Sequence, residues 1–335
     1  MRDRRDFLSA ALAAAAVGQI GMSSAVRAAT TPTARTAFGS YKQVQAGLLN
    51  VGYAEEGPAN GPVAILLHGW PYDIHSYLDA SSVLTAAGFR VIVPYLRGYG
   101  TTRFLSDQSI RNGQQSALGK DVVDLMDALD IRSALLAGFD WGARTAAVVA
   151  ALWPERCRAL VSVSGYLITN LEFNKQPLPP SAELGWWYQY YFATERGRVG
   201  YERNHREFAK LIWKIASPRW AFDDATFERS ARAFDNPDHT AIVVHNYRWR
   251  LGLADGEPRY DAIESRLQSA PVIAVPTITI GSDFDGAAAD GKPYAAKFSG
   301  PYRHQTLNGI GHNVPQEAPE AFAAAVIEAN GMAKP

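Results

Sequence analysis

The chain has 335 residues, 47% of them hydrophobic, and its 33 basic and 33 acidic residues give a formal net charge of zero. This composition supplies a large buried core and shows no bias toward nucleic acid or an anionic membrane surface. The single cysteine, Cys157, excludes an intramolecular disulfide and a metal site built from several cysteines; its apolar neighbourhood favours buried packing.

The first 28 residues have the pattern of an export signal. Arg4 and Arg5 precede a short apolar stretch, Leu8–Val17, and Val26-Arg27-Ala28 offers a small-residue cleavage site. The apolar stretch is too short to span a bilayer. We expect a twin-arginine signal over residues 1–28, recognised by the twin-arginine translocation machinery and cleaved, which leaves a periplasmic or secreted protein with no stable membrane anchor. The alternative is a helical or disordered N-terminus of a cytoplasmic protein.

Short apolar runs then alternate with helix-like segments. A hairpin is expected around Gly47, and helices are expected near 77–87, 121–129, 143–153 and 319–329. Continuous apolar runs of this length suit strands buried on both faces of a parallel sheet. The alternation predicts an α/β fold with a mostly parallel sheet flanked by helices and a site at the carboxyl ends of the strands. The expected buried strands are Val63–Leu67, Val91–Val93, Ala134–Gly138, Leu160–Val163 and Thr277–Ile280.

The alternation stops between residues 169 and 268. This part has helical stretches rich in Trp, Tyr and Arg but no convincing buried strand, and Lys175–Pro180 is a helix-breaking connector. We predict a helical cap over 169–268, inserted between a first part of the core at 36–168 and a second part at 269–335.

The stretch Gly138–Gly142 contains the central functional signal. A strand meets a tight turn and a helix, a geometry that exposes one strained residue in the nucleophile elbow of α/β-hydrolases. Here that residue is Asp140. A carboxylate that attacked an ester would form a reactive anhydride, whereas displacement at an sp3 carbon gives a stable alkyl ester that water can cleave. Epoxides and alkyl halides are such substrates.

Two further motifs supply partners for this nucleophile. His68–Pro71 follows the first buried strand, so the backbone N–H groups of Trp70 and Trp141 are expected to form an oxyanion hole. His312 lies between small residues after the last strand and is the candidate base that activates water. We expect His68 itself to be a structural hydrogen-bonding residue rather than a base.

The acid that orients the base should follow the strand at 277–280. Asp283 and Asp285 both lie in this loop. Asp285 is favoured because Gly286 permits the chain to turn back toward His312, and Asp283 is the alternative.

Taken together, the chain resembles epoxide hydrolases of the α/β-hydrolase superfamily, which are close to haloalkane dehalogenases. The resemblance covers the core from about residue 36 to the end, and its motifs are His68–Pro71, Arg97–Gly100, Gly138–Gly142 and Gly311-His312. It implies that two cap tyrosines hydrogen-bond the epoxide oxygen and protonate it.

Two cap segments match those tyrosine positions. Trp187–Phe192 and Asn246–Arg248 indicate Tyr188 and Tyr247, with Tyr190 or Tyr191 as alternatives to Tyr188. A neutral phenol suits this role because an opening epoxide develops an alkoxide, a stronger base than phenolate. His68, Trp187 and Tyr191 are expected to contact the substrate.

The resemblance also separates the related activities. Dehalogenases of this type carry Asn where this chain has Trp70, and fluoroacetate dehalogenases carry Arg where it has Trp141, so that only Arg144 remains of their pair. We therefore expect hydrolysis of an apolar epoxide to a vicinal diol, without metal or other cofactor. The alternatives are a hydrolytic dehalogenase and a ligand-binding hydrolase fold without turnover.

Overall fold

The computed structural model describes residues 35–333. The predicted export signal over 1–28 lies outside this range. Among the described residues, no helix combines the length and the apolar character needed to cross a membrane.

The core is built on one twisted sheet whose strands run in the order β1-β2-β4-β3-β6-β7-β8-β9. β1 and β2 form the predicted antiparallel hairpin, β2 also pairs antiparallel with β4 and β5, and every pairing from β4 through β9 is parallel. The prediction of a mostly parallel sheet is therefore confirmed. The strands are β1 Tyr41–Ala46, β2 Leu49–Glu56, β3 Val63–Leu67, β4 Arg90–Pro94, β5 Arg103–Phe104, β6 Ala134–Gly138, β7 Cys157–Val163, β8 Thr277–Ser282 and β9 Tyr302–Leu307.

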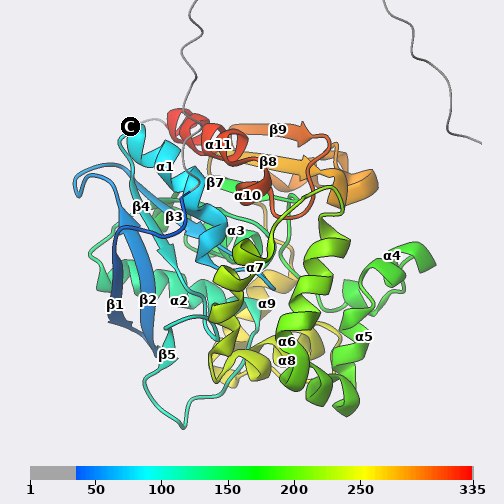
Figure 1. Cartoon of the computed structure of the whole chain (residues 1–335). Helices are drawn as coiled ribbons and strands as arrows, with labels where there is room; N and C mark the ends of the chain where they lie inside the picture. The colour runs from blue at the N-terminus through cyan, green and yellow to red at the C-terminus, as the bar shows by residue number, and fades with distance from the viewer. Residues whose placement is uncertain (1–34, 334–335) are drawn as a thin grey trace, which may run out of the picture. The chain divides into compact units, whose positions relative to one another are not determined.

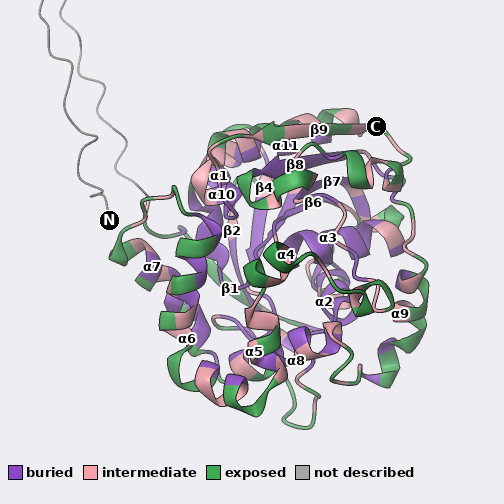
Figure 2. Cartoon of the chain, turned by 90° about the vertical axis from the view of Figure 1, so that its right-hand side faces the viewer, coloured by how far each residue is buried: buried purple, intermediate pink, exposed green. Residues whose placement is uncertain are grey.

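Helices cover both faces of the sheet (Figure 1). On one face α2 packs against α3, which lies over β6 and β7, and on the other α1 packs against α11. The central strands are buried between these layers (Figure 2), which explains why they consist almost entirely of aliphatic residues. The core helices are α1 Leu78–Ala86, α2 Gln115–Ala128, α3 Trp141–Leu152, α10 Val314–Glu317 and α11 Pro319–Met332.

The chain between β7 and β8 contains helices and no named strand. The helices are α4 Pro180–Gly185, α5 Tyr188–Ala193, α6 Glu195–Ala216, α7 Asp224–Ala231, α8 His239–Arg250 and α9 Asp261–Gln268. Short 3-10 helices connect elements of the core and this segment: η1 Ile74–Tyr77, η2 Pro154–Arg156, η3 Phe173–Lys175, η4 Arg232–Asp235, η5 Pro258–Tyr260, η6 Asp283–Ala288 and η7 Lys292–Lys297.

Trp213 on α6 anchors this helical cap to the core. Its indole is fully buried, donates a hydrogen bond from Nε1 to the carbonyl of Pro71 at 2.7 Å and stacks on Tyr72 with the ring centroids 4.9 Å apart. A buried indole that both fills space and satisfies its N–H fixes the orientation of the helix that carries it.

The turn between β6 and α3 is as tight as the sequence predicted. Asp140 has φ 53° and ψ −125°, a strained conformation for a residue with a side chain. A Cβ atom on Gly142 would lie 1.7 Å from the carbonyl oxygen of Leu67, so only glycine allows the first turn of α3 to approach the end of β3. The strain at Asp140 is therefore held by packing on both sides of the turn.

We predict that Gly142→Ala lowers the free energy of unfolding by about 1 to 3 kcal/mol or more, because the added methyl meets backbone that cannot move aside. Gly331→Ala on α11 is the control, since a Cβ there meets nothing within 4 Å; it should be neutral or stabilise by about 0.5–1 kcal/mol. Urea unfolding measures both. Equal stabilities of the two variants would contradict the prediction.

Candidate active site

Three predicted site residues meet at the carboxyl ends of β3 and β6. The Oδ1 atom of Asp140 accepts a hydrogen bond from the backbone N–H of Trp70 at 2.8 Å, and its Oδ2 atom lies 3.4 Å from Nε2 of His312. The two oxygens of one carboxylate thus have different partners. One faces a predicted oxyanion-hole donor and the other faces the predicted base.

Gly69 makes this approach possible. A Cβ atom at this position would lie 2.3 Å from the Cβ of Asp140. Because the loop after β3 must pass directly over the elbow for the Trp70 N–H to point at the carboxylate, the position next to it must lack a side chain.

The surroundings of Asp140 favour its charged form. Burial by itself would raise the pKa of this carboxyl, but the hydrogen bond and charge of His312, the charge of Arg144 and the backbone N–H of Trp141 together hold its pKa below the ordinary value of 3.8. Asp140 is therefore a carboxylate at neutral pH, as a nucleophile must be.

The predicted acid does not contact His312. Nδ1 of His312 is buried and has no hydrogen-bond partner among the described residues. Asp285 instead caps its own 3-10 helix by accepting a hydrogen bond from the backbone N–H of Ser282 at 2.8 Å. Asp283 accepts from the backbone N–H of Gly309 at 3.1 Å and points to solvent beside Arg219.

Phe284, between these two acids, packs against the base with the two rings tilted by 43°. Its ring centroid lies 4.1 Å from that of His312. The sequence predicted the acid in this loop, but the competition between an N-terminal cap and a distant imidazole depends on loop geometry that spacing does not reveal.

The two cap tyrosines pack against Trp70, and Tyr188 lines the cavity at Asp140. The Tyr188 and Tyr247 rings are 5.3 Å apart between centroids, and both contact the indole of Trp70. Burial first, and for both the charge of Asp140 among the further causes, raises the pKa of each phenol well above 10. Both side chains therefore stay protonated and able to donate. Tyr190 points away: its ring is 49% exposed and its hydroxyl hydrogen-bonds Glu183.

The three predicted substrate contacts have other positions. His68 is fully buried, with Nε2 accepting from the backbone N–H of Leu96 at 3.2 Å and Nδ1 lying 3.1 Å from the carbonyl oxygen of Gly69. Trp187 and Tyr191 pack against Phe208, with Tyr191 stacked on it at 5.7 Å. None of the three lines the small cavity at Asp140. Within the described residues they hold the loop and the cap in shape.

A buried hydrogen-bond relay, which sequence reasoning missed, joins the site to the cap. Nε1 of Trp70 donates to the hydroxyl of Tyr201 on α6 at 2.8 Å, and that hydroxyl is 2.8 Å from Nε2 of His239 on α8. Nδ1 of His239 lies 2.9 Å from the carbonyl oxygen of Gly98. The directions are consistent only if His239 is neutral with its proton on Nδ1. No local motif marked Tyr201 or His239, because their partners are more than a hundred residues away or in another helix.

The cavity beside Asp140 is small. Centres of water-sized molecules can occupy only about 20 Å³, roughly the space of one or two waters. Its apolar walls are Ile212, Ile215, Ala216 and Phe284. Ile215, Ala216 and Phe284 also line a larger outer cavity of about 240 Å³, so Phe284 stands between the outer cavity and the site.

Within residues 35–333, no three His, Cys, Asp or Glu side chains are grouped as a metal site would require.

Residues 62–198 match the family model described as the alpha/beta hydrolase fold. Over a wider range, the chain is 58% identical to a protein of known crystal structure from Klebsiella pneumoniae, provisionally named an epoxide hydrolase; the match covers 88% of this chain and 98% of that one, with a TM-score of 0.86. The chain is an epoxide hydrolase-like α/β-hydrolase.

Curated relatives of this α/β-hydrolase carry two kinds of name. Epoxide hydrolase B of Mycobacterium tuberculosis is 33% identical over 42% of each chain, and a haloalkane dehalogenase of Mycolicibacterium paratuberculosis is 30% identical over 60% of this chain and 66% of its own. The α/β-hydrolase spans less than half the length of several epoxide hydrolases that it matches. The elbow, the fold and these relatives agree on an enzyme of the hydrolase class.

The relay generates a prediction about acid stability. Burial lowers the pKa of His239 from 6.5 to about 3, against the smaller raising effect of the hydrogen bond to Gly98. Below pH 6.5 His239 therefore binds a proton in the unfolded chain but not in the folded chain. The free energy of unfolding consequently falls as the pH falls toward 3. Each such residue contributes about 1.4 kcal/mol per pH unit to this slope.

We predict that His239→Gln flattens the dependence of the unfolding free energy on pH within this window by up to that amount, measured by urea unfolding at a series of pH values. The comparison of slopes, rather than of stabilities, separates the titration from the loss of a hydrogen bond. Parallel slopes in the wild type and the variant would refute the assignment.

Proposed function

We propose that this α/β-hydrolase hydrolyses an epoxide to a vicinal diol through an ester on Asp140. The observation that carries the proposal is the divided environment of the Asp140 carboxylate. Oδ1 lies 2.8 Å from the Trp70 N–H, while Oδ2 lies 3.4 Å from His312 in a cavity lined by the Tyr188 phenol.

In the first half-reaction, Oδ2 of Asp140 attacks an epoxide carbon. The carbon–oxygen bond of the ring breaks and its electron pair moves to the oxygen, which takes a proton from Tyr188 or Tyr247. Their raised pKa values keep both phenols protonated until an alkoxide, a stronger base, develops beside them. The product is a hydroxyalkyl ester of Asp140, whose carbonyl oxygen is Oδ1.

In the second half-reaction, water attacks the ester carbon. His312 accepts a proton from the water, and the negative charge that develops on Oδ1 is stabilised by the N–H groups of Trp70 and Trp141. Collapse of this intermediate releases the alkoxide oxygen of the diol, which takes the proton held by His312. The other proton of the water, left on the Asp140 carboxyl, returns to the tyrosinate formed in the first half-reaction, which restores both the carboxylate and the phenol. Oδ1 already occupies the position of the oxyanion in the resting protein, so no rearrangement of the donor is needed.

Asp285 remains our candidate for the acid that supports His312. The buried Nδ1 of His312 has no partner among the described residues, and an unmatched buried polar atom costs about 1–3 kcal/mol. Asp285 uses only local hydrogen bonds to Ser282. A rotation of the 283–288 loop about Gly286, which has φ 53° and ψ −123°, would release the carboxylate toward the imidazole.

The names of the relatives support an epoxide, and the haloalkane dehalogenase relative makes halide displacement the second candidate. The phenol pair favours the epoxide, because its leaving oxygen needs a proton and a halide does not. We also propose that the protein acts in the periplasm or outside the cell after twin-arginine export, on the basis of residues 1–28.

The decisive experiment traps the ester. Incubated with a panel of terminal epoxides, the His312→Gln variant should form the ester on Asp140 and accumulate it as a covalent adduct. The wild type should convert the epoxides to diols, and Asp140→Asn should form neither adduct nor diol. Intact mass followed by peptide mapping measures the adduct. Asp285→Asn should also accumulate ester if it is the acid, and Asp283→Asn should not.

Two outcomes would overturn the proposal. Halide release from haloalkanes without diol formation would make the protein a dehalogenase. The absence of adduct and product with every epoxide and haloalkane would leave a binding protein.

The cap tyrosines give a separate prediction. Tyr188→Phe and Tyr247→Phe should each lower kcat for epoxide opening by at least about tenfold, and the double variant should approach the 10²–10⁴-fold typical of a lost general acid. Tyr190→Phe, on the exposed face of the same helix, is the matched control and should keep full activity toward a neutral epoxide. Single-turnover kinetics of ester formation measures the effect; equal losses in all three variants would contradict the assignment.

A further inference from the structure

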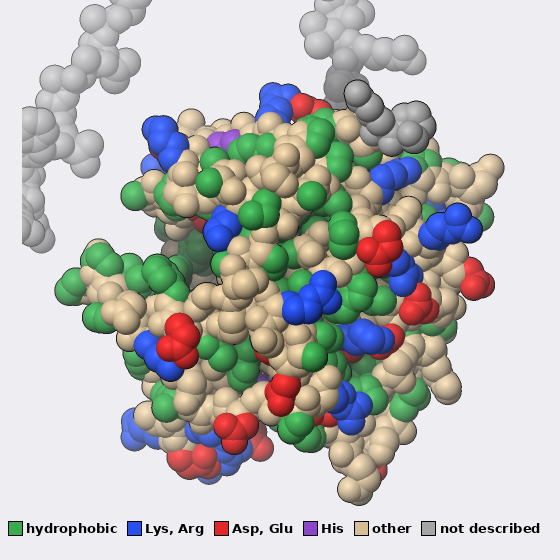
Figure 3. Space-filling view, turned by 180° about the vertical axis from the view of Figure 1, so that it is seen from behind, with side chains coloured by type: hydrophobic (Ala, Val, Ile, Leu, Met, Phe, Trp, Pro, Cys, Tyr) green, Lys and Arg blue, Asp and Glu red, His purple; other side chains and the backbone are tan. Residues whose placement is uncertain are grey.

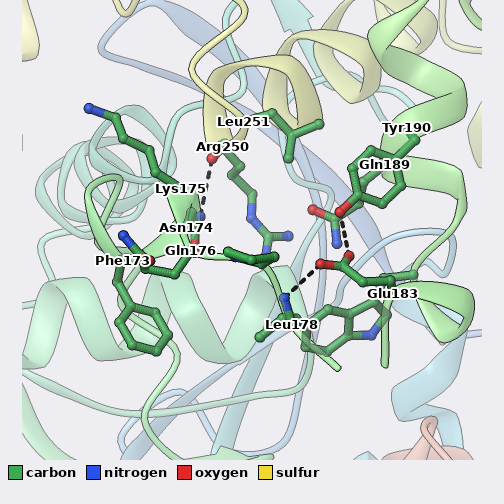
Figure 4. A pocket seen from close by; sticks show the side chains of 12 residues that line it. Phe173, Asn174, Lys175, Gln176, Leu178, Glu183, Gln189, Tyr190, Arg250 and Leu251 are labelled. Atoms are coloured by element: carbon green, nitrogen blue, oxygen red, sulfur yellow. Dashed lines mark hydrogen bonds between the residues drawn. The ribbon is translucent and has the colours of Figure 1, made fainter. Parts of the chain in front are cut away.

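A second, larger cavity opens in the cap on the far side of the α4–α5 connection from the catalytic cavity. Its volume is about 600 Å³. The walls are partly apolar, from Phe173, Leu178, Trp186 and Leu251, and Arg250 at the end of α8 reaches towards its centre (Figure 4). We call this the Arg250 pocket. Trp186 lines it, while the preceding residue, Gly185, lines the cavity at Asp140. The two cavities therefore flank the same short segment of chain.

Arg250 carries an uncompensated charge. Its buried Nε has no hydrogen-bond partner among residues 35–333, and the described carboxylates form no ion pair with it. Glu183, the carboxylate that lines the same pocket, accepts hydrogen bonds from the backbone N–H of Leu178 and from Tyr190 instead. A partly buried guanidinium without an anion is unfavourable unless a ligand provides one.

Arg144 adds a second cation nearby. It is 8% exposed, and its Nη1 is buried without a partner among the described residues, although its Nε donates to the carbonyl of Leu167 at 3.0 Å. Burial first, and then the charge of Arg250, lower the pKa of Arg144 to about 10. The two guanidinium groups thus repel each other across the site, which further favours an anion between or beside them.

The Arg250 pocket also adjoins the catalytic tyrosines. The guanidinium lies 5.7 Å from the ring centroid of Tyr247, within the range of a cation–π contact. A ligand group held by Arg250 would therefore lie beside Tyr247, which packs against Tyr188 at the cavity of Asp140.

From this geometry we propose that the Arg250 pocket binds the carboxylate of an epoxy-acid substrate, whose apolar chain runs past Trp186 to place the epoxide at Asp140. A carboxylate matches the planar fork of a guanidinium, and the apolar walls fit a short alkyl chain. The proposal rests on the proposed function for the identity of the reacting group, but not for the binding of the acid. The proposal changes the expected substrate from a wholly apolar epoxide to an epoxide that also carries a carboxylate.

The face shown in Figure 3 carries acidic and basic side chains interspersed rather than gathered by sign. Selectivity for an acid should therefore depend on Arg250 itself and not on long-range attraction by the surface.

The first test compares the terminal epoxide of hexenoic acid with that of its primary amide. The wild type should prefer the acid by about tenfold or more in kcat/KM, mostly through KM, as expected for a charge-assisted hydrogen bond. Arg250→Gln should abolish this preference and Arg250→Lys should keep part of it. Arg132→Gln is the matched control, because it removes the same charge from an exposed position before β6.

The second test needs no turnover. Calorimetric titration of the Asp140→Asn protein with hexanoate should detect binding that weakens about tenfold or more when Arg250→Gln is added, whereas hexanamide should bind weakly to both. Thermal unfolding verifies that each variant is folded.

The outcomes separate the two proposals. If no epoxide is hydrolysed but hexanoate still binds through Arg250, the proposed function fails and the acid pocket stands. If epoxides are hydrolysed with an acid preference that Arg250→Gln leaves intact, or if hexanoate does not bind, the acid pocket is refuted.

Discussion

Trp70 is the residue through which the core and the cap depend on each other. Its backbone N–H holds Oδ1 of Asp140, its indole N–H begins the relay to Tyr201 and His239, and its ring contacts both Tyr188 and Tyr247. The nucleophile, the cap helices and the candidate proton donors are therefore positioned by one side chain and its own backbone. A displacement of the loop after β3 would disturb all three together.

The same arrangement sets the protonation states that the proposed chemistry needs. His239 and Tyr247 are buried and Tyr188 is largely enclosed beside the cavity, so burial keeps all three neutral. Asp140 is the exception, because His312, Arg144 and backbone N–H groups outweigh its burial and keep it charged. A single apolar enclosure thus contains neutral donors and one anionic nucleophile, and the difference comes from the partners rather than from the degree of burial.

The sequence predicted most of the core because its signals are local. Buried parallel strands must be continuously apolar, and β3 and β6 were located to the residue; an elbow must be flanked by glycine, which identified Asp140. Where an element is only partly buried, this signal weakens. β9, Tyr302–Leu307, lies at the edge of the sheet with alternating polar residues and was missed, and α2 begins at Gln115, six residues before the predicted start.

The site could be predicted only as far as its motifs reach. Motif order brought Asp140, Trp70 and His312 together, but the partner of Asp285 depends on a loop conformation. His68 is the structural hydrogen-bonding residue that its position indicated, whereas the substrate contact expected of it is absent from the cavity at Asp140. Arg144 and Arg250 became informative only when their missing counter-ions were known, which is a property of three-dimensional neighbours and not of spacing.

The small size of the cavity at Asp140 has a consequence for the product. Hydration adds the atoms of one water to the epoxide, so the diol is larger and more polar than the molecule that entered. A chamber with room for about 20 Å³ of water centres holds only a water or two at rest, so its walls must move apart for substrate and product alike. Phe284 lines both this chamber and the larger outer cavity, so its displacement would join the two.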